Sequence, residues 1–278
     1  MVRAEQAMGR PRVRRKKRRV RSFLRRLVLF LFVFVCALGA LRFAGPLIAD
    51  MDREDLREIR TMARQDARLK AILEEPDAYP EALLGLLTRN PETADFVLDY
   101  PTHAADPVPE TLTESLDTVP LLLQWDERWG YQTYGSGMIA ETGCGPTCLA
   151  MAAAYLRQDA SITPYRVAQY AAQAGFYVSG TGTSWSLMTD GGREFGITGT
   201  ELPLDEGSIN KALDAGKLVI CSMRPGDFTT AGHFIVLTGR TSAGYTVHDP
   251  NSRERSAQTW TYDRLSGQIS NLWKMQSA

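Results

Sequence analysis

A cysteine between two glycines, at the start of a long apolar stretch, constrains the fold of this chain most. Gly143-Cys144-Gly145 runs through Pro146 into a segment rich in Ala, Leu and Met that reaches Leu156. Proline is favoured in the first turn of a helix, and the free N–H groups and dipole at that end favour negative charge. A thiol placed there ionises readily. We therefore predict that Cys144 is a nucleophile at a helix N-terminus, with a buried packing cysteine as the alternative.

The sequence contains only three histidines, so few residues can serve as a base for Cys144. His103 lies in a proline-rich stretch and has no evident role. His233 and His248 each border a strand-like run, and Asp249 follows His248 directly. A catalytic imidazole needs a third group that orients its ring. A hairpin turn near residues 241–244 would place His233 opposite Asp249, whereas His248 points to the other face, so we choose His233 and Asp249.

The charge of the chain is strongly polarised. Residues 1–26 carry 12 basic and 1 acidic side chains, which leaves 20 basic and 31 acidic among the other 252, a net charge of −11. Clustered cations can bind nucleic-acid phosphates. Here they precede the unbroken apolar run Leu27–Leu41, and basic residues beside such a run stay on the cytoplasmic side of a membrane. We therefore predict a basic cytoplasmic segment over 1–26, and a membrane rather than nucleic acid as its partner.

The apolar segment predicts a single-pass membrane protein. Its 15 residues lie between the core of a signal peptide and the roughly 17–25 residues of a spanning helix. Further apolar residues follow Arg42, and Ala37-Leu38-Gly39 makes a poor cleavage site. We favour an uncleaved signal anchor over residues 27–49, with everything after Asp50 extracytoplasmic.

Residues 50–100 predict a small helical region with an apolar docking face. Apolar residues recur at three- and four-residue spacing from Asp55 to Glu74, where Pro76 ends the first helix. A second helix is expected after Pro80, and a third reaches Leu98. Prolines at 101, 107 and 109 then mark a linker over 101–118.

The remaining residues, 119–278, predict an α+β domain with helices before strands. Helices are expected from the Thr163-Pro164 start and over Ser208–Ala215. β-branched and aromatic runs follow, and we expect the helices to pack on one side of an antiparallel sheet. The predicted strands are Leu218–Met223, His233–Thr238, Tyr245–His248 and one that includes Leu272–Met275.

Four motifs in residues 119–278 resemble the papain-like cysteine peptidases of the bacteriocin-processing type, family thirty-nine, and especially their stand-alone extracytoplasmic bacterial forms. They are the run from Gln124 to Trp129, Gly143–Thr147 with the Leu149-Ala150-Met151 that follows, Gly232–Leu237, and Asp249-Pro250. The helical stretch that contains Asn90-Pro91-Glu92 also resembles the region before this domain in extracellular relatives. The resemblance implies a papain-like fold and a peptide or protein substrate, with no metal or cofactor.

Carried over by position, the resemblance implies Cys144 as nucleophile, His233 as base and Asp249 as the orienting group. Papain-like enzymes usually place a glutamine a few residues before the cysteine, where it binds the oxyanion. Residues 138–143 contain none. Gln124 matches the stand-alone relatives and is the candidate for this role, with a strand-end amide near Trp125 as the alternative.

Three functions remain open from the sequence. The first is a membrane-anchored peptidase that works by a Cys-His-Asp mechanism through a thioester acyl-enzyme. The second is a peptidoglycan cross-bridge hydrolase of the NlpC type, although those enzymes usually use a second histidine as the third group. The third is a catalytically silent peptide-binding domain. Cys148 and Cys221 could pair, but we expect Cys148 to be buried and free.

Overall fold

The structure is a computed structural model that describes residues 54–278, and the residues from Glu58 onward form one compact unit. The predicted basic segment 1–26 and signal anchor 27–49 lie outside the described residues. Within the described part of the chain, no helix is both long and apolar enough to cross a membrane.

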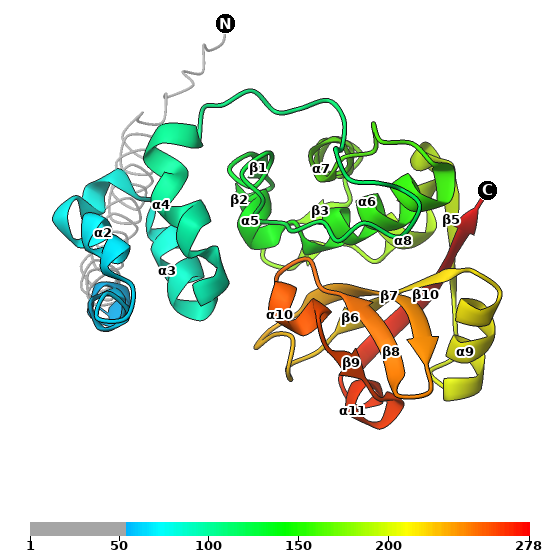
Figure 1. The fold of residues 1–278 in the computed structure, drawn as a ribbon. Coiled ribbons are helices and arrows are strands. Elements are labelled where there is room, and N and C mark those ends of the chain that lie inside the picture. The colour runs from blue at the N-terminus through cyan, green and yellow to red at the C-terminus, as the bar shows by residue number, and fades with distance from the viewer. Residues whose placement is uncertain (1–53) are drawn as a thin grey trace, which may run out of the picture. The chain divides into compact units, whose positions relative to one another are not determined.

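The helical region is built from short helices joined by 3-10 turns (Figure 1). The helix predicted from Asp55 to Glu74 is interrupted, because residues 54–62 are helical and turns follow. The side chain of Asp66 accepts a hydrogen bond from the Arg68 N–H and caps a new turn, which competes with continuation of the helix. The elements are η1 (Ala67–Leu69), α2 (Lys70–Glu74), η2 (Pro76–Ala78), α3 (Glu81–Arg89), η3 (Pro91–Thr93) and α4 (Ala94–His103).

Helix α4 extends past the predicted boundary at residue 100, so the linker begins later than expected. The helix ends at His103 and includes Pro101. A proline in a helix removes one hydrogen bond and crowds the preceding turn, which disfavours an interior position. Pro101 lies in the last turn, where little helix remains to be disturbed.

The domain that follows mixes helices with antiparallel strands, as predicted. Its first half is mostly helical and contains β1 (Thr133–Tyr134), β2 (Gly137–Met138), α5 (Ile139–Thr142), α6 (Cys144–Arg157), α7 (Pro164–Gln173), β3 (Tyr177–Val178), β4 (Gly182–Thr183), α8 (Ser186–Thr189) and η4 (Gly191–Phe195). Its second half contains β5 (Ile197–Glu201), α9 (Glu206–Asp214), β6 (Leu218–Met223), β7 (His233–Thr241), β8 (Gly244–His248), α10 (Arg253–Ser256), β9 (Thr259–Trp260), α11 (Tyr262–Ser266) and β10 (Ile269–Ser277).

Six strands form the main sheet, in the order β5-β10-β6-β7-β8-β9, with every neighbouring pair antiparallel. Helices cover both of its faces, so the prediction of helices on one side is wrong (Figure 1). The reason is visible in β6, whose six residues are all buried. A strand that is apolar on both faces needs cover on both. Helix α6 packs on one face, and α9 and α11 pack on the other.

The β7–β8 register differs by two residues from the one predicted. Val236 pairs with His248, so the continued register places Asp249 opposite Ile235 rather than His233, and the pairing shifts again between Leu237 and Gly239. A shift by an even number of residues leaves a side chain on the same face of a sheet. His233 and Asp249 therefore still share a face, and the imidazole reaches the carboxylate diagonally.

Candidate active site

Cys144 is the first residue of α6, as predicted, and Gly143 precedes it as the N-cap. Both flanking glycines lie where a larger residue has no room. A Cβ on Gly143 would lie 2.5 Å from the Ile139 carbonyl oxygen, and one on Gly145 would lie 2.7 Å from the Thr183 side chain. The first N–H groups of a helix have no partner within that helix. The Cys144 thiol is therefore half-buried, and it lies in a close-packed turn at the electropositive end of a helix.

His233 and Asp249 form a buried pair beside this helix end. The Nε2 of His233 lies 2.7 Å from Oδ1 of Asp249, and the two side chains are 6% and 0% exposed. His233 begins β7, and Asp249 follows the last residue of β8. The Nε2–H donates to the carboxylate, so Nδ1 is the ring nitrogen left to serve the thiol.

The electrostatics of the pair favour an imidazolium next to a carboxylate. Burial lowers the pKa of His233, but the charge and hydrogen bond of Asp249, together with the neighbouring Cys144, raise it to about 10. Burial raises the pKa of Asp249, yet attraction to His233 and Arg255 holds it below its usual value. A strongly shifted pKa in a cleft marks a candidate functional site.

Cys144 and His233 line the same pocket, which has a volume of about 610 Å³. The thiol lies close enough to the imidazole to influence its pKa. One wall is the loop of residues 226–232 before β7, and another comes from the helical region through Leu86, Arg89 and Asn90. A contribution of the helical region to the pocket was not predicted from the sequence.

Gln124 lies in this pocket too, with 3% of its surface exposed. Its Nε2 donates to the carbonyl of Ala140 at 2.6 Å, and its backbone N–H donates to the carbonyl of Pro250 at 2.7 Å. An amide nitrogen carries two hydrogens, and the bond to Ala140 uses one of them. The Oε1 atom has no hydrogen-bond partner among the described residues. The structure thus brings together all four predicted residues, Cys144, His233, Asp249 and Gln124.

Within residues 54–278, the other histidines and cysteines are not part of the His233–Asp249 pair. His103 is exposed, and its Nδ1 lies 2.8 Å from Oδ2 of Asp106. Nδ1 of His248 donates to the Pro120 carbonyl at 3.2 Å. Burial raises the pKa of Cys148 far above its ordinary value, and Cys221 is likewise buried with a raised pKa. Both thiols are free, as expected for Cys148.

Sequence reasoning missed Arg255, which supports the far side of Asp249. Its Nε donates to Oδ2 of the carboxylate at 2.5 Å, while the Asn251 N–H donates to Oδ1 at 2.8 Å. Arg255 lies on the four-residue helix α10. The only available signal was its position six residues after Asp249, which identifies no role by itself.

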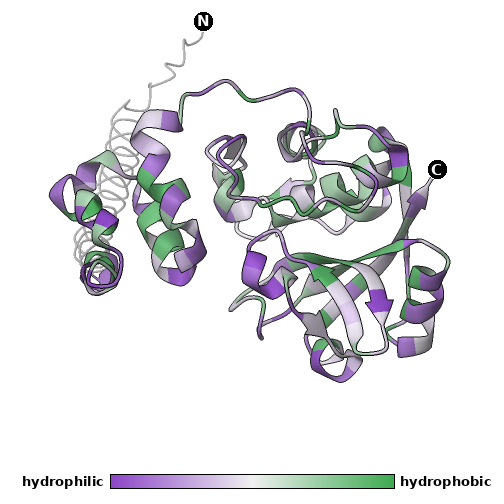
Figure 2. Ribbon diagram, in the orientation of Figure 1, coloured by the Kyte–Doolittle hydropathy of each residue, from purple (hydrophilic) through white to green (hydrophobic). Residues whose placement is uncertain are grey.

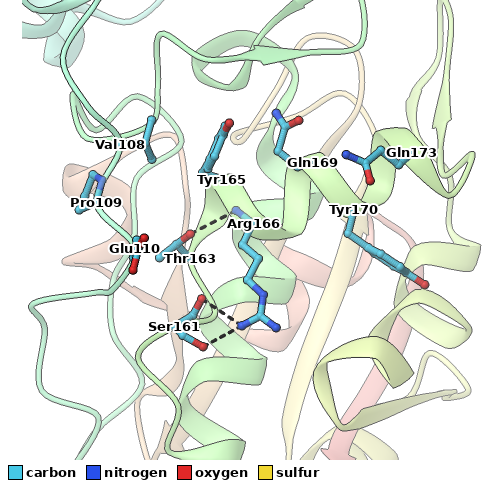
Figure 3. Close-up of a pocket in the computed structure, with 10 residues that line it drawn as sticks. All are labelled: Val108, Pro109, Glu110, Ser161, Thr163, Tyr165, Arg166, Gln169, Tyr170 and Gln173. Carbon is cyan, nitrogen blue, oxygen red and sulfur yellow. Dashed lines mark hydrogen bonds between the residues drawn. The ribbon is translucent and has the colours of Figure 1, made fainter.

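A second pocket, of about 480 Å³, lies between residues 108–110 and α7 (Figure 3). Arg166 in this pocket donates to the Ser161 hydroxyl at 2.7 Å, and no cysteine or histidine lines the pocket. Over residues 54–278, no group of His, Cys, Asp and Glu side chains has an arrangement that could hold a metal ion.

Comparison with known proteins agrees with the geometry around Cys144. The model of the Peptidase_C39 like family matches residues 116–278, which is more than half of the chain. No curated protein matches the chain. The matched residues include the whole main sheet, helix α6 and the four predicted site residues. The chain therefore belongs to the Peptidase_C39 like family, whose domains are of the cysteine peptidase type and imply peptide or protein substrates.

Proposed function

We propose that the protein is a membrane-anchored, outward-facing cysteine peptidase that hydrolyses peptide bonds through a thioester acyl-enzyme. The observation that carries this proposal is the buried His233–Asp249 pair beside the Cys144 thiol at the tip of α6. A nucleophile, a base and a group that orients the base are the three parts this chemistry needs.

In the first half of the reaction, the Cys144 thiolate attacks the carbonyl carbon of the scissile peptide bond. The carbonyl oxygen takes the negative charge, and the free N–H of Gln124 and the end of α6 are the donors for it. The tetrahedral intermediate collapses as the C–N bond breaks. His233, as an imidazolium, gives its proton to the leaving amine, and the acyl group remains on sulfur.

In the second half, His233 is neutral and accepts a proton from water, which attacks the thioester carbonyl. The C–S bond breaks, the carboxylic acid product leaves, and the thiolate–imidazolium pair is restored. Asp249 keeps its charge throughout and holds the ring through Nε2. Its role is to orient the imidazole and stabilise its charged form.

The identity of the third group favours peptidase over cross-bridge hydrolase. Enzymes of the NlpC type usually use a second histidine there, whereas here the partner of His233 is a carboxylate. His248 donates to a backbone carbonyl instead. The presence of all three groups in one site also argues against a silent binding domain.

The proposed anchoring rests on the sequence of residues 1–49. Eleven Lys and Arg residues between Arg10 and Arg26 precede the apolar run, which orients the N-terminus to the cytoplasm. A cysteine-reactive reagent that cannot cross membranes, applied to intact cells, tests this orientation. We expect a cysteine introduced at exposed Glu110 to react without lysis, and protection until lysis would contradict the proposal.

The activity is tested by labelling the full chain with a thiol-directed peptide electrophile and locating the adduct by mass spectrometry. We expect the wild type to be labelled at Cys144, with the label lost in Cys144→Ala and strongly reduced in His233→Ala. Equal labelling of all three proteins would contradict the enzyme assignment. Incubation with peptide libraries and with purified muropeptides then separates the two hydrolase functions, because only a peptidase cleaves the first set broadly.

Gln124 offers a test of the oxyanion site. Gln124→Ala removes the side-chain donor and should lower kcat by about 10²–10³-fold, the usual cost of losing one such donor. KM should change little, because the donor acts mainly on the transition state. A KM effect with unchanged kcat would instead assign Gln124 to substrate binding.

A further inference from the structure

Asp249 lies in a segment held in place mainly by polar contacts, residues 249–256, which we call the aspartate loop. Its helix α10 has no buried residue, and Figure 2 shows α10 as hydrophilic. A helix without an apolar face gains no stability from packing into a core. The position of the aspartate loop therefore depends on its hydrogen bonds, which include one from Trp125 Nε1 to the Asn251 carbonyl at 3.1 Å, and on the stacking of Arg253 over the Trp125 ring.

The aspartate loop also supplies the two further donors to the Asp249 carboxylate. The Asn251 N–H contacts Oδ1 at 2.8 Å, and Arg255 Nε contacts Oδ2 at 2.5 Å. A carboxylate buried with 0% exposure needs such partners to remain charged. A shift of the loop would move both donors and turn the carboxylate relative to His233.

Two residues of the helical region hold the aspartate loop. Asn90 donates from Nδ2 to the carbonyl of Asn251 at 2.7 Å. Glu92 accepts from the Arg253 N–H at 2.8 Å and from the Ser252 hydroxyl. Its carboxylate thereby caps the N-terminus of α10 from outside, in the manner of a capping side chain.

Neighbouring aromatic contacts fix the helical region on the same part of the domain. The ring of Phe96 in α4 stacks on Tyr131 with centroids 4.2 Å apart, and the Tyr131 hydroxyl donates to the Phe96 carbonyl at 2.7 Å. The approach is close, because a Cβ on Gly130 would lie 2.6 Å from the Phe96 ring. Asn90 and Glu92 are therefore presented to the aspartate loop from a firmly packed support.

We propose that Glu92 and Asn90 are positioning residues of the active site, which hold the aspartate loop so that Asp249 stays aimed at His233. The inference rests on the proposed function, since it concerns the same catalytic pair. It assigns to the helical region a part in catalysis: the region supplies one wall of the substrate pocket and also supports the orienting carboxylate.

The test is the pH dependence of Cys144 alkylation by iodoacetamide in the full chain, with the adduct located by mass spectrometry. Glu92→Ala should slow alkylation near pH 6 by about tenfold, because a His233 ring that Asp249 holds less firmly stabilises the neighbouring thiolate less, and one pKa unit of lost interaction lowers the fraction of thiolate–imidazolium pair by that factor. Near pH 9 the rate should match the wild type, because free thiols in general are largely ionised at that pH. The conservative Glu92→Gln keeps one acceptor oxygen and should recover most of the rate at pH 6.

Glu74→Gln is the matched control, because it removes an exposed carboxylate of the same region at the end of α2. Its pH profile should equal that of the wild type. If Glu92→Ala fails to fold, Asn90→Ala provides the same comparison with a smaller expected loss. An unchanged ratio of the rates at the two pH values in the folded variants would overturn the inference. A wild type that reacts at pH 6 no faster than His233→Ala would instead overturn the proposed function.

Discussion

The β7–β8 hairpin carries a histidine on each of its two faces, and the comparison shows how surroundings set the charge of an imidazole. His233 is buried and His248 is half-buried. Burial lowers the pKa of His248, and a hydrogen bond to the Pro120 carbonyl does not offset that effect. Burial lowers the pKa of His233 as well, yet the charge and hydrogen bond of Asp249, together with Cys144, raise it to about 10.

The lesson is that burial alone makes a histidine neutral, whereas a buried carboxylate makes it cationic. Sequence neighbours do not decide which case applies. Asp249 is adjacent to His248 along the chain, but successive strand residues point to opposite faces, so its carboxylate serves His233 instead. The alternation of the strand thus separates the histidine that we propose as the base from the one that contacts a backbone carbonyl.

The largest expected difference comes from removing each histidine in turn. His233→Ala should lower kcat/KM by about 10⁴-fold, because the general acid–base is lost and with it the stabilisation of the thiolate. His248→Gln keeps a donor for the Pro120 carbonyl and should leave kcat/KM close to the wild-type value. Steady-state kinetics with a peptide substrate checks both. A comparable loss of kcat/KM in the two variants would contradict the different roles proposed for His233 and His248.

Asp249→Asn should give the second-largest effect, because it makes the surroundings of His233 resemble those of His248. The amide cannot stabilise an imidazolium, so the pKa of His233 should fall, and we expect kcat to drop by about 10²–10⁴-fold. The change also leaves Arg255 without its charged partner, which destabilises the fold by less than the about 3–5 kcal/mol of a fully buried pair, because the Arg255 side chain is 24% exposed. Thermal melting followed by circular dichroism must therefore accompany the kinetics.

A folded Asp249→Asn protein with wild-type kcat would show that the carboxylate does not orient the base. Asp249→Ala serves as the second variant, since it removes the amide that could hold the ring in a wrong tautomer. Both variants should lose the rapid alkylation of Cys144 near neutral pH.

The sequence was sufficient for the parts of the site that have local signals. Two glycines and a proline marked the helix start at Cys144, and the small number of histidines directed attention to His233. The alternation of strand side chains selected Asp249 even though the predicted register was two residues off. A shift by two residues leaves each side chain on the same face of the sheet. The strands with long apolar runs were also found at nearly their observed positions.

What the sequence could not provide are contacts between distant segments. Glu92 and Ser252 are 160 residues apart, and neither has a local pattern that predicts their hydrogen bond. β5, with Gly199 and polar neighbours at the sheet edge, lacks the apolar run by which the central strands were recognised. The second helical layer was missed because a largely apolar strand such as β6 was not interpreted as buried on both faces.

The smallest expected effect is on the pH dependence of folding, where the two histidines act with opposite signs. His248 has a lowered pKa in the folded protein. At pH values below its ordinary value of about 6.5, the unfolded chain therefore binds a proton on this imidazole more readily than the folded one, and the free energy of unfolding decreases as the pH is lowered. His233 has a raised pKa, so its contribution is complete below about 6.5 and is lost as the pH rises towards about 10.

Comparison of His248→Gln with the wild type isolates the contribution of His248 to the pH dependence of stability. Between about pH 7.5 and pH 5, the wild type should lose stability relative to the variant by at most about 1.4 kcal/mol per pH unit, since one proton is involved. Urea titrations of both proteins across this range measure the difference. Asp249 also weakens folding in acid, because its pKa is lowered, but that contribution is the same in both proteins and cancels. Parallel stability curves for the two proteins would mean that His248 titrates normally, and the contrast between the two faces of the hairpin would then rest on His233 alone.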